Sequence, residues 1–176
     1  QRQMCIRDSD NAPYCVSIAL RDKDSLLLGV VYDPCLDECF YAWKGGGAYL
    51  NGQSLQVSSV RSMEASFVVT ELPYNSEQYA RTGEYLIREL YGRVAGIRMN
   101  GSAAIALCYV AAGRFDAWLE AFLGKWDFSA AALIVQEAGG RVTDFYGNAG
   151  FIDGHHVVAT NGWLHPFLLE LVQKAM

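Results

Sequence analysis

The feature that most constrains the fold of this chain is a helix signature at residues 126–140, Trp-Asp-Phe-Ser-Ala-Ala-Ala-Leu-Ile-Val-Gln-Glu-Ala-Gly-Gly. Apolar residues recur at the i, i+3, i+4 spacing that gives a helix one buried face, with Leu133 and Ile134 on one turn. Three consecutive alanines keep the N-terminal half narrow. The Gly-Gly pair ends the helix, because glycine adopts the left-handed C-cap conformation at little cost. The pattern therefore predicts a packed helix, followed by a strand at residues 141–145.

Asp127 stands at the front of this helix and has two interpretations. An acid in the first turn suits the positive end of the helix dipole, an effect worth ~0.5 kcal/mol. Alternatively, the carboxylate points into a cleft as a ligand for a hard cation such as Mg²⁺, which prefers oxygen ligands. Periodicity alone does not decide between the two.

The rest of the chain is rich in hairpins in its first half and alternates strands with helices in its second half. Asn51-Gly52 is a strong hairpin signal. The triple glycine at residues 45–47 lacks the Lys-Ser/Thr ending of a phosphate-binding loop and is interpreted as a plain turn. We expect one domain of the α/β class, a layered α+β sandwich. Strands are expected at residues 14–20, 26–32, 38–44, 48–50, 66–71, 94–98, 115–121 and 156–160, and further helices at 76–91, 102–112 and 163–174.

Composition excludes several classes of function. The 176 residues are 52% hydrophobic and 19% charged, which is typical of a chain that folds. The net charge of -5 argues against a nucleic-acid-binding surface, and no apolar run is long enough to span a bilayer. No secretory signal is evident. The five cysteines form no Cys-x-x-Cys pair, and Cys35 and Cys39 have no second metal half-site, so we expect reduced thiols in a cytoplasmic protein.

Several segments carry a resemblance to a known family. Trp-Asp-x-x-Ala, followed by Glu-Ala-Gly-Gly and a nearby Asp, is similar to the C-terminal signature of the inositol monophosphatase family, whose members are metal-dependent phosphatases of sugars and polyols. The similarity covers nearly everything from Asp10 onward. It is carried further by residues 29–34 (Gly-Val-Val-Tyr-Asp-Pro), 38–42 (Glu-Cys-Phe-Tyr-Ala), 45–52 (Gly-Gly-Gly-Ala-Tyr-Leu-Asn-Gly), 101–104 (Gly-Ser-Ala-Ala) and 109–117 (Tyr-Val-Ala-Ala-Gly-Arg-Phe-Asp-Ala).

The resemblance implies the sugar-phosphatase fold of that family and a role for particular residues. In the family the Asp of Trp-Asp is a metal ligand, so Asp127 is implied as a catalytic residue that binds Mg²⁺ and contacts the substrate. Glu120 matches the acid that accepts hydrogen bonds from polyol hydroxyls. Gly101, Ser102 and Ala103 match a turn beside the substrate, where small residues let a ligand approach the backbone. Ser102 is alternatively only the N-cap of the following helix.

The other metal-binding motifs of the family, a Glu-Glu pair and Asp-Pro-x-Asp-Gly-Thr, are absent from this sequence. Asp33-Pro34 lacks the Gly-Thr and is interpreted as a strand-end turn. We expect residues 1–9 to be a non-native, adapter-like segment, and residues 10–176 to be the C-terminal portion of a single inositol monophosphatase-like domain. With Asp127 as the one matching metal ligand, we expect the chain as given to be inactive. We also expect exposed apolar surface where the missing part would pack.

The function that the resemblance implies for the complete protein is Mg²⁺-dependent hydrolysis of a small phosphate monoester, by a cytoplasmic homodimer that binds neither nucleic acid nor membrane. An inositol phosphate, histidinol phosphate, a sugar bisphosphate and a nucleotide 3′-phosphate all remain open as substrates. The alternative is a non-catalytic protein-binding or assembly module, because some members of the family have partner-protein roles. The upstream gene sequence distinguishes the two, since only the enzyme needs the Glu-Glu and Asp-Pro-x-Asp-Gly-Thr motifs.

Four other side chains near the signature have simpler interpretations. Trp126 is expected in the core, where it fixes the orientation of Asp127. Lys125 is expected to be a solvated surface charge. His155 and His156 are adjacent, so they point to opposite sides of a strand and do not form a helical i, i+4 metal pair. Tyr74 matches a small polar substrate contact of some family members only loosely.

Overall fold

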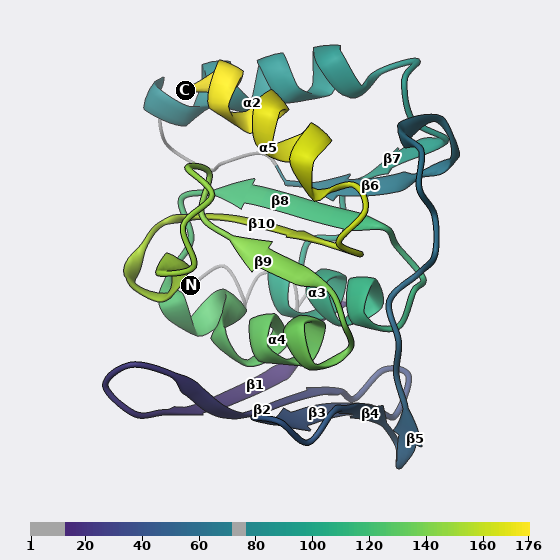
Figure 1. Ribbon diagram of the computed structural model, residues 1–176, viewed down its shortest axis with the longest axis vertical. Helices are drawn as coiled ribbons and strands as arrows, with labels where there is room; N and C mark the ends of the chain where they lie inside the picture. Colours follow the sequence, from purple (N-terminus) through teal and green to yellow (C-terminus); the bar gives the residue numbers. More distant parts are fainter. Residues whose placement is uncertain (1–12, 72–76) are drawn as a thin grey trace.

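Two β-sheets and two pairs of helices alternate as four layers in this chain (Figure 1). The computed structural model describes residues 13–71 and 77–176. In the orientation of Figure 1 a helix pair lies at the top, a sheet beneath it, the second helix pair below that, and the other sheet at the bottom. The layered α/β class expected from the sequence is confirmed, because helix layers cover both faces of the second sheet and one face of the first sheet.

The first sheet is an antiparallel meander whose strands follow chain order. Its strands are β1 (Val16–Arg21), β2 (Leu26–Asp33), β3 (Glu38–Trp43), β4 (Ala48–Leu50) and β5 (Gln53–Ser54). Asn51 and Gly52 join β4 to β5 with φ angles of 47° and 86°, the pair of positive values that a two-residue type I′ hairpin requires. The hairpin predicted from Asn-Gly is therefore confirmed. Val31 and Phe40 lie on the inner face and are fully buried.

The outer face of the first sheet is apolar and exposed. Strand register places Ile18 opposite Val30 and Leu20 opposite Leu28 on this face, and Ile18 and Leu20 are each 57% exposed. In the part of the chain that is described, no helix lies against it (Figure 1). We call this surface the outer apolar face; it comprises Val16, Ile18, Leu20, Leu28, Val30 and the stacked rings of Tyr41, Trp43 and Tyr49.

The second sheet mixes parallel and antiparallel strands. Its strands are β6 (Phe67–Thr70), β7 (Gly96–Arg98), β8 (Ala117–Ala121), β9 (Arg141–Thr143) and β10 (His156–Thr160), in the spatial order β7-β6-β8-β10-β9. Strand β6 pairs in parallel with β7 and with β8, whereas β10 is antiparallel to both β8 and β9. Because the carboxyl ends of parallel strands lie at one edge of a sheet, the residues that follow Thr70 and Leu119 are neighbours.

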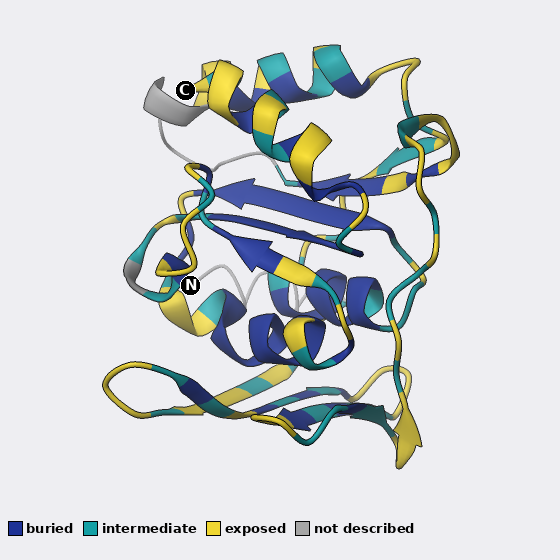
Figure 2. Cartoon of the chain, in the orientation of Figure 1, coloured by how far each residue is buried: buried dark blue, intermediate teal, exposed yellow. Residues whose placement is uncertain are grey.

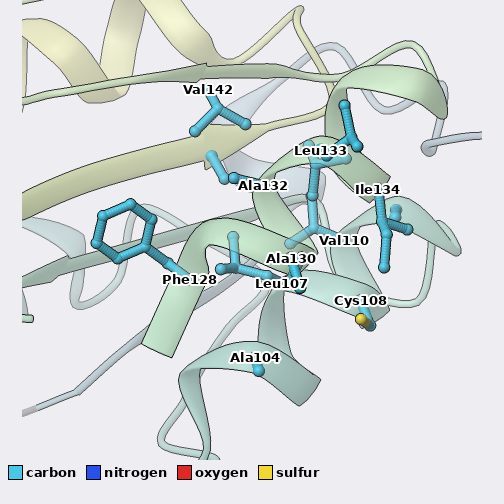
Figure 3. Close-up of a cluster of buried hydrophobic side chains, with 14 of the residues drawn as sticks. Ala104, Leu107, Cys108, Val110, Phe128, Ala130, Ala132, Leu133, Ile134 and Val142 are labelled. Carbon is cyan, nitrogen blue, oxygen red and sulfur yellow. The ribbon is translucent and has the colours of Figure 1, made fainter. Parts of the chain in front are cut away.

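The inner helix pair is enclosed by the two sheets, and this explains its composition. These helices are α3 (Ala103–Ala111) and α4 (Lys125–Glu137). A helix covered on several sides is apolar all round, and the side chains of both helices interdigitate in one buried cluster (Figure 3). Small residues allow close approach: a Cβ on Gly29 of β2 would lie 2.3 Å from the Ala130 carbonyl oxygen of α4. The alanine run predicted to keep this helix narrow is therefore packed directly against the first sheet.

The outer helix pair, α2 (Glu77–Leu90) and α5 (His165–Ala175), covers the far face of the second sheet. Dark-blue residues in Figure 2 line the sheet side of this layer, and exposed residues gather on its solvent side. Leu86, Leu90, Leu168 and Val172 from the two helices pack in one buried cluster with residues of β8 and β10. Amphipathic helices of this kind are stabilised mainly by burial of the apolar stripe.

The predicted elements are present, and their ends coincide with the prediction or differ from it by at most three residues. Three short elements were not predicted, namely β5 and the 3₁₀ turns η1 (Met63–Ala65) and η2 (Phe151–Asp153), which lack a periodic pattern. The predicted start of α2 at Ser76 and the loosely matched Tyr74 lie outside the described residues, as do residues 1–9. Among the helices of the described part, none combines the length and the apolar character needed to cross a membrane.

Candidate active site

Asp127 lies in the first turn of α4, directly after the loop that leaves β8. Its Oδ2 accepts a hydrogen bond from the backbone N–H of Gly124 at 2.9 Å, so the carboxylate caps the helix as well as carrying negative charge to its positive end. Burial raises the pKa of Asp127, although the bond from Gly124 opposes this. One carboxylate oxygen of Asp127 therefore acts as a helix cap, and the other oxygen makes no cap hydrogen bond.

Glu120 lies on β8 and is almost completely buried, with 9% of its surface exposed. Its Oε2 has no hydrogen-bond partner among the described residues. Burial, followed by the charges of Glu71 and Asp127, raises the pKa of Glu120 to about 8. A buried carboxyl group in this setting is mostly protonated near neutral pH and can both donate and accept hydrogen bonds.

The turn at residues 101–103 begins α3 and is open to solvent. Gly101 is exposed and has a φ of +78°, a conformation that favours glycine. Ser102 is the N-cap residue of α3, as one of its two interpretations expected, but its hydroxyl makes no cap hydrogen bond. The Ser102 Oγ instead lies 3.7 Å from the Sγ of Cys15. Ala103 is half-buried, and the turn therefore leaves both backbone and hydroxyl accessible to a ligand.

Cys15 links this turn electrostatically to the start of α4. Burial raises the pKa of the Cys15 thiol, the hydrogen bond with Ser102 lowers it, and the charges of Asp33 and Asp127 raise it again. Asp127 also acts on Glu120, so its charge reaches both Cys15, which precedes β1, and Glu120 on β8. Because Ser102 at the start of α3 contacts Cys15, the structure links Glu120, Asp127 and Ser102 through these interactions.

Glu71, which follows β6, belongs to the same region and was not singled out from the sequence. Its Oε1 accepts hydrogen bonds from the backbone N–H groups of Asn100 at 2.5 Å and Gly101 at 2.7 Å. The parallel pairing of Thr70 with Leu119 sets Glu71 beside Glu120. A signal was present, because each of two predicted strands has a glutamate as its last or next-to-last residue, but no local sequence pattern predicts that the two strands are parallel neighbours.

Two of the simpler interpretations are confirmed. Asp33 forms the expected turn, with its Oδ1 accepting from the N–H groups of Cys35 at 2.8 Å and Leu36 at 3.3 Å. Lys125 is exposed at the first position of α4.

The expectation for Trp126 is wrong. This residue is 72% exposed rather than part of the core, and its indole lies against Gly124, where a Cβ would meet it at 2.4 Å. The apolar stripe of α4 begins only at Phe128, so residue 126 falls on the solvent side of the first turn.

The carboxylates of the described residues do not complete a metal centre. No group of three or more His, Cys, Asp or Glu side chains that could hold an ion occurs in the described ranges. Asp127 fits Mg²⁺ as one hard oxygen ligand, because one of its carboxylate oxygens is left outside the helix cap. A single carboxylate does not define the coordination geometry that Mg²⁺ requires.

Comparison with known proteins gives a consistent family match. Residues 9–176 match the model of the inositol monophosphatase family. Among curated proteins, the Nus factor SuhB of Pseudomonas aeruginosa is 44% identical over 162 residues, which are 91% of this chain and 60% of that protein. An inositol-1-monophosphatase of Rhizobium meliloti is 36% identical over 163 residues, 92% of this chain and 60% of that protein.

Solved structures agree with the sequence comparison. The extragenic suppressor protein suhB of Bartonella henselae superimposes with a TM-score of 0.92 at 34% identity, over 99% of this chain and 68% of that one. An IMPase of Thermotoga maritima superimposes with a TM-score of 0.89 at 31% identity, over 98% of this chain and 66% of that one. The chain spans about 60% of the length of the two curated relatives.

Proposed function

The chain belongs to the inositol monophosphatase family, and from this premise we propose that it serves in the Mg²⁺-dependent hydrolysis of a small phosphate monoester. The observation that carries the proposal is the placement of Glu120, a buried carboxyl group with an unpartnered oxygen, in the same charged region as Asp127 at the start of α4. Acids with perturbed pKa values that converge in this way are typical of functional sites.

We assign Asp127 as a metal ligand and as the catalytic residue of the described part. A bound Mg²⁺ supplies charge neutralisation on the phosphoryl oxygens and lowers the pKa of a coordinated water. The carboxylate of Asp127 would hold the ion through the oxygen that does not accept from Gly124. Because the described residues provide no second and third ligand, we propose that the chain as given hydrolyses no phosphate monoester at a useful rate.

Glu120 and the turn at residues 101–103 are proposed to bind the alcohol part of the substrate. A carboxyl group with a pKa of about 8 suits a neutral hydroxyl better than a phosphate dianion, because it offers both a donor and an acceptor without full negative charge. Gly101, Ser102 and Ala103 leave room for a ligand near the backbone. A polyol such as myo-inositol presents the matching hydroxyl groups, and the name of the Rhizobium meliloti relative points the same way.

Three finer features complete the proposal. We propose Mg²⁺ as the metal, and a carboxylate oxygen as the candidate ligand is compatible with this hard cation. We propose a cytoplasmic location, and the four cysteines of the described part, which are free thiols, support it. We also propose that the complete protein is a homodimer that acts on a small molecule and binds neither nucleic acid nor membrane. Histidinol phosphate, a sugar bisphosphate and a nucleotide 3′-phosphate remain alternative substrates.

The second candidate function is a non-catalytic role as a protein-binding or assembly module. The observation that favours it is the similarity to relatives named Nus factor SuhB, at 44% identity to the Pseudomonas aeruginosa protein and 43% to that of Escherichia coli. Under this alternative the fold is retained as an interaction scaffold and the carboxylates of the site have no catalytic task.

A chimaera tests the two candidates. The N-terminal portion of the Pseudomonas aeruginosa relative that this chain does not match is joined in front of residues 10–176, and phosphate release from myo-inositol 1-phosphate is measured against Mg²⁺ concentration. Mg²⁺-dependent hydrolysis supports the enzyme. A folded chimaera that releases no phosphate from this ester or from the alternative substrates contradicts the enzyme and favours the assembly module.

A further inference from the structure

Glu71 has a structural link to the substrate turn that the proposed chemistry does not use. It stands one residue beyond β6, and its Oε1 accepts from two consecutive backbone N–H groups, those of Asn100 and Gly101. Asn100 and Gly101 lie between β7 and α3, so one carboxylate at the end of β6 holds the connection that leads into the substrate turn. Hydrogen bonds to a charged acceptor are about twice as strong as neutral ones.

The same carboxylate lies beside Glu120. Strands β6 and β8 run parallel with Thr70 opposite Leu119, which places Glu71 and Glu120 at the next step of the pair. The two glutamates interact electrostatically although they are distant in sequence. Glu71 therefore contacts one proposed binding element directly and neighbours the other.

Two buried polar atoms on either side of Glu71 have no hydrogen-bond partner among the described residues. These are the Nδ2 of Asn100 and the Oε2 of Glu120. Buried polar groups without a partner are costly, and they are found where a ligand or an ordered water completes the hydrogen bonds. Glu71 accepts a hydrogen bond from the backbone of Asn100 and is the neighbour of Glu120 on the adjacent strand.

We propose that Glu71 is a positioning residue of the site, which fixes the backbone of Asn100 and Gly101 and thereby sets the distance between the turn at residues 101–103 and Glu120. The inference rests on the proposed function only in taking that turn and Glu120 as the surface that binds a polyol. Glu71 acts through its Oε1 acceptor, and we assign it neither a metal-binding nor a catalytic role. A small displacement of positioned groups is costly for ligand binding because contacts with several hydroxyls must be made together.

The test uses the 176-residue chain and two variants of nearly equal side-chain length. Glu71→Met removes the acceptor and keeps the apolar stem, whereas Glu71→Gln keeps an acceptor oxygen and removes the charge. Glu84→Met, at an exposed position of α2, is the matched control. Amide hydrogen exchange at Asn100 and Gly101 is measured by NMR, and affinity for myo-inositol is measured from the amide shifts of residues 101–103.

Glu71→Met is expected to speed exchange at both amides by about tenfold and to weaken myo-inositol binding by a similar factor, as for loss of a hydrogen bond to a charged group. Glu71→Gln should remain within about threefold of the parent chain in both measurements, because a neutral acceptor retains part of that bond. Unchanged exchange in Glu71→Met overturns the inference. So does faster exchange with unchanged affinity, or a Glu71→Gln variant as impaired as Glu71→Met.

The exchange measurement and the affinity measurement test this inference and the proposed function separately. A parent chain that binds no myo-inositol contradicts the proposed substrate class, while the exchange rates still decide whether Glu71 holds the turn. If Glu71→Met does not fold, Glu71→Gln decides alone: retained protection of the two amides supports the inference, and lost protection overturns it.

Discussion

Glu71 and Glu120 lie side by side at the ends of two parallel strands, although 48 residues separate them in the chain. One of them is engaged by two backbone N–H groups, and the other keeps a buried oxygen without a partner in the described part. Burial, followed by the charges of Glu71 and Asp127, raises the pKa of Glu120 to about 8. This environment keeps the carboxyl group mostly neutral near pH 7, in line with the role that we propose for it toward substrate hydroxyls.

The raised pKa of Glu120 predicts a pH-dependent stability. In the folded chain Glu120 holds its proton up to about pH 8, whereas the unfolded chain releases it near pH 4.5. The contribution of Glu120 to the free energy of unfolding is therefore fully present below about pH 4.5 and is lost as pH rises through 8. This contribution is on the order of a few kcal/mol. Urea unfolding between pH 5 and 9 should show this decline in the parent chain and a flatter profile in Glu120→Gln. Glu84→Gln, at an exposed site, is the control, and equal slopes in the parent chain and Glu120→Gln would refute the assignment.

His165 predicts a dependence of the opposite sign. It is fully buried between Thr143, 3.0 Å from its Nε2, and Thr160, 3.1 Å from its Nδ1, and burial and the charge of Arg141 lower its pKa from 6.5 to about 4. As pH falls, this histidine takes up a proton in the unfolded chain before it does so in the folded chain. The stability that the neutral, buried imidazole contributes is therefore present above about pH 6.5 and is lost as pH falls through 4.

Replacement of His165 should remove that acid sensitivity. The His165→Gln variant is expected to lose about 1–3 kcal/mol at pH 7, because two buried threonine hydroxyls lose a partner, and to lose less additional stability on acidification. Thermal melts at pH 7 and pH 5 measure both effects, with the exposed His155→Gln as control. The Glu120→Gln variant is melted as well, because the contribution of Glu120 has the opposite sign and could mask that of His165. If the parent chain and Glu120→Gln each melt at the same temperature at pH 7 and pH 5, His165 is not buried as a neutral group.

The outer apolar face predicts self-association of the chain as given. Exposed apolar side chains that gather on and beside an edge strand favour contacts between molecules. Light scattering should detect association that grows with concentration, and the double substitution Ile18→Thr and Leu20→Thr should reduce it while keeping strand propensity. Gln53→Thr, on an exposed strand position away from the face, should have no effect. A monodisperse parent chain that melts cooperatively would count against the expectation that a further segment packs there.

Local signals in the sequence were sufficient for much of the fold. Helix α4 followed from the periodicity and the Gly-Gly end of the signature at residues 126–140, and the Asn51-Gly52 hairpin followed from its turn chemistry. The place of Asp127 in the first helical turn followed from the same pattern, whereas its role as a metal ligand is implied by the family resemblance alone.

Features that depend on long-range packing were not predictable in this way. The contact of Cys15 with Ser102 spans 87 residues and joins two elements whose order in space is set by the sandwich. The pairing of Glu71 with Glu120 depends on a parallel register that no local pattern encodes. Trp126 was misplaced because a large aromatic residue favours the core on average, whereas its position in the first turn of α4 points it to solvent.

The measurement that tests the central claim most directly is phosphate release from myo-inositol 1-phosphate during a Mg²⁺ titration, with the chimaera, its Asp127→Asn variant and the chain as given compared side by side. Asp127→Asn keeps an oxygen that can accept from Gly124, so the fold should persist, but it removes ligand charge where phosphoryl charge develops. We expect the Asp127→Asn chimaera to hydrolyse the ester more slowly than its parent by about 10²-fold or more. A Glu120→Gln chimaera should have a raised KM and an unchanged dependence of the rate on Mg²⁺ concentration. The chain as given should show no activity. Asp24→Asn, at an exposed turn, is the control. Full activity in the bare chain, or an Asp127→Asn chimaera as active as its parent, would contradict the placement of the chemistry at Asp127.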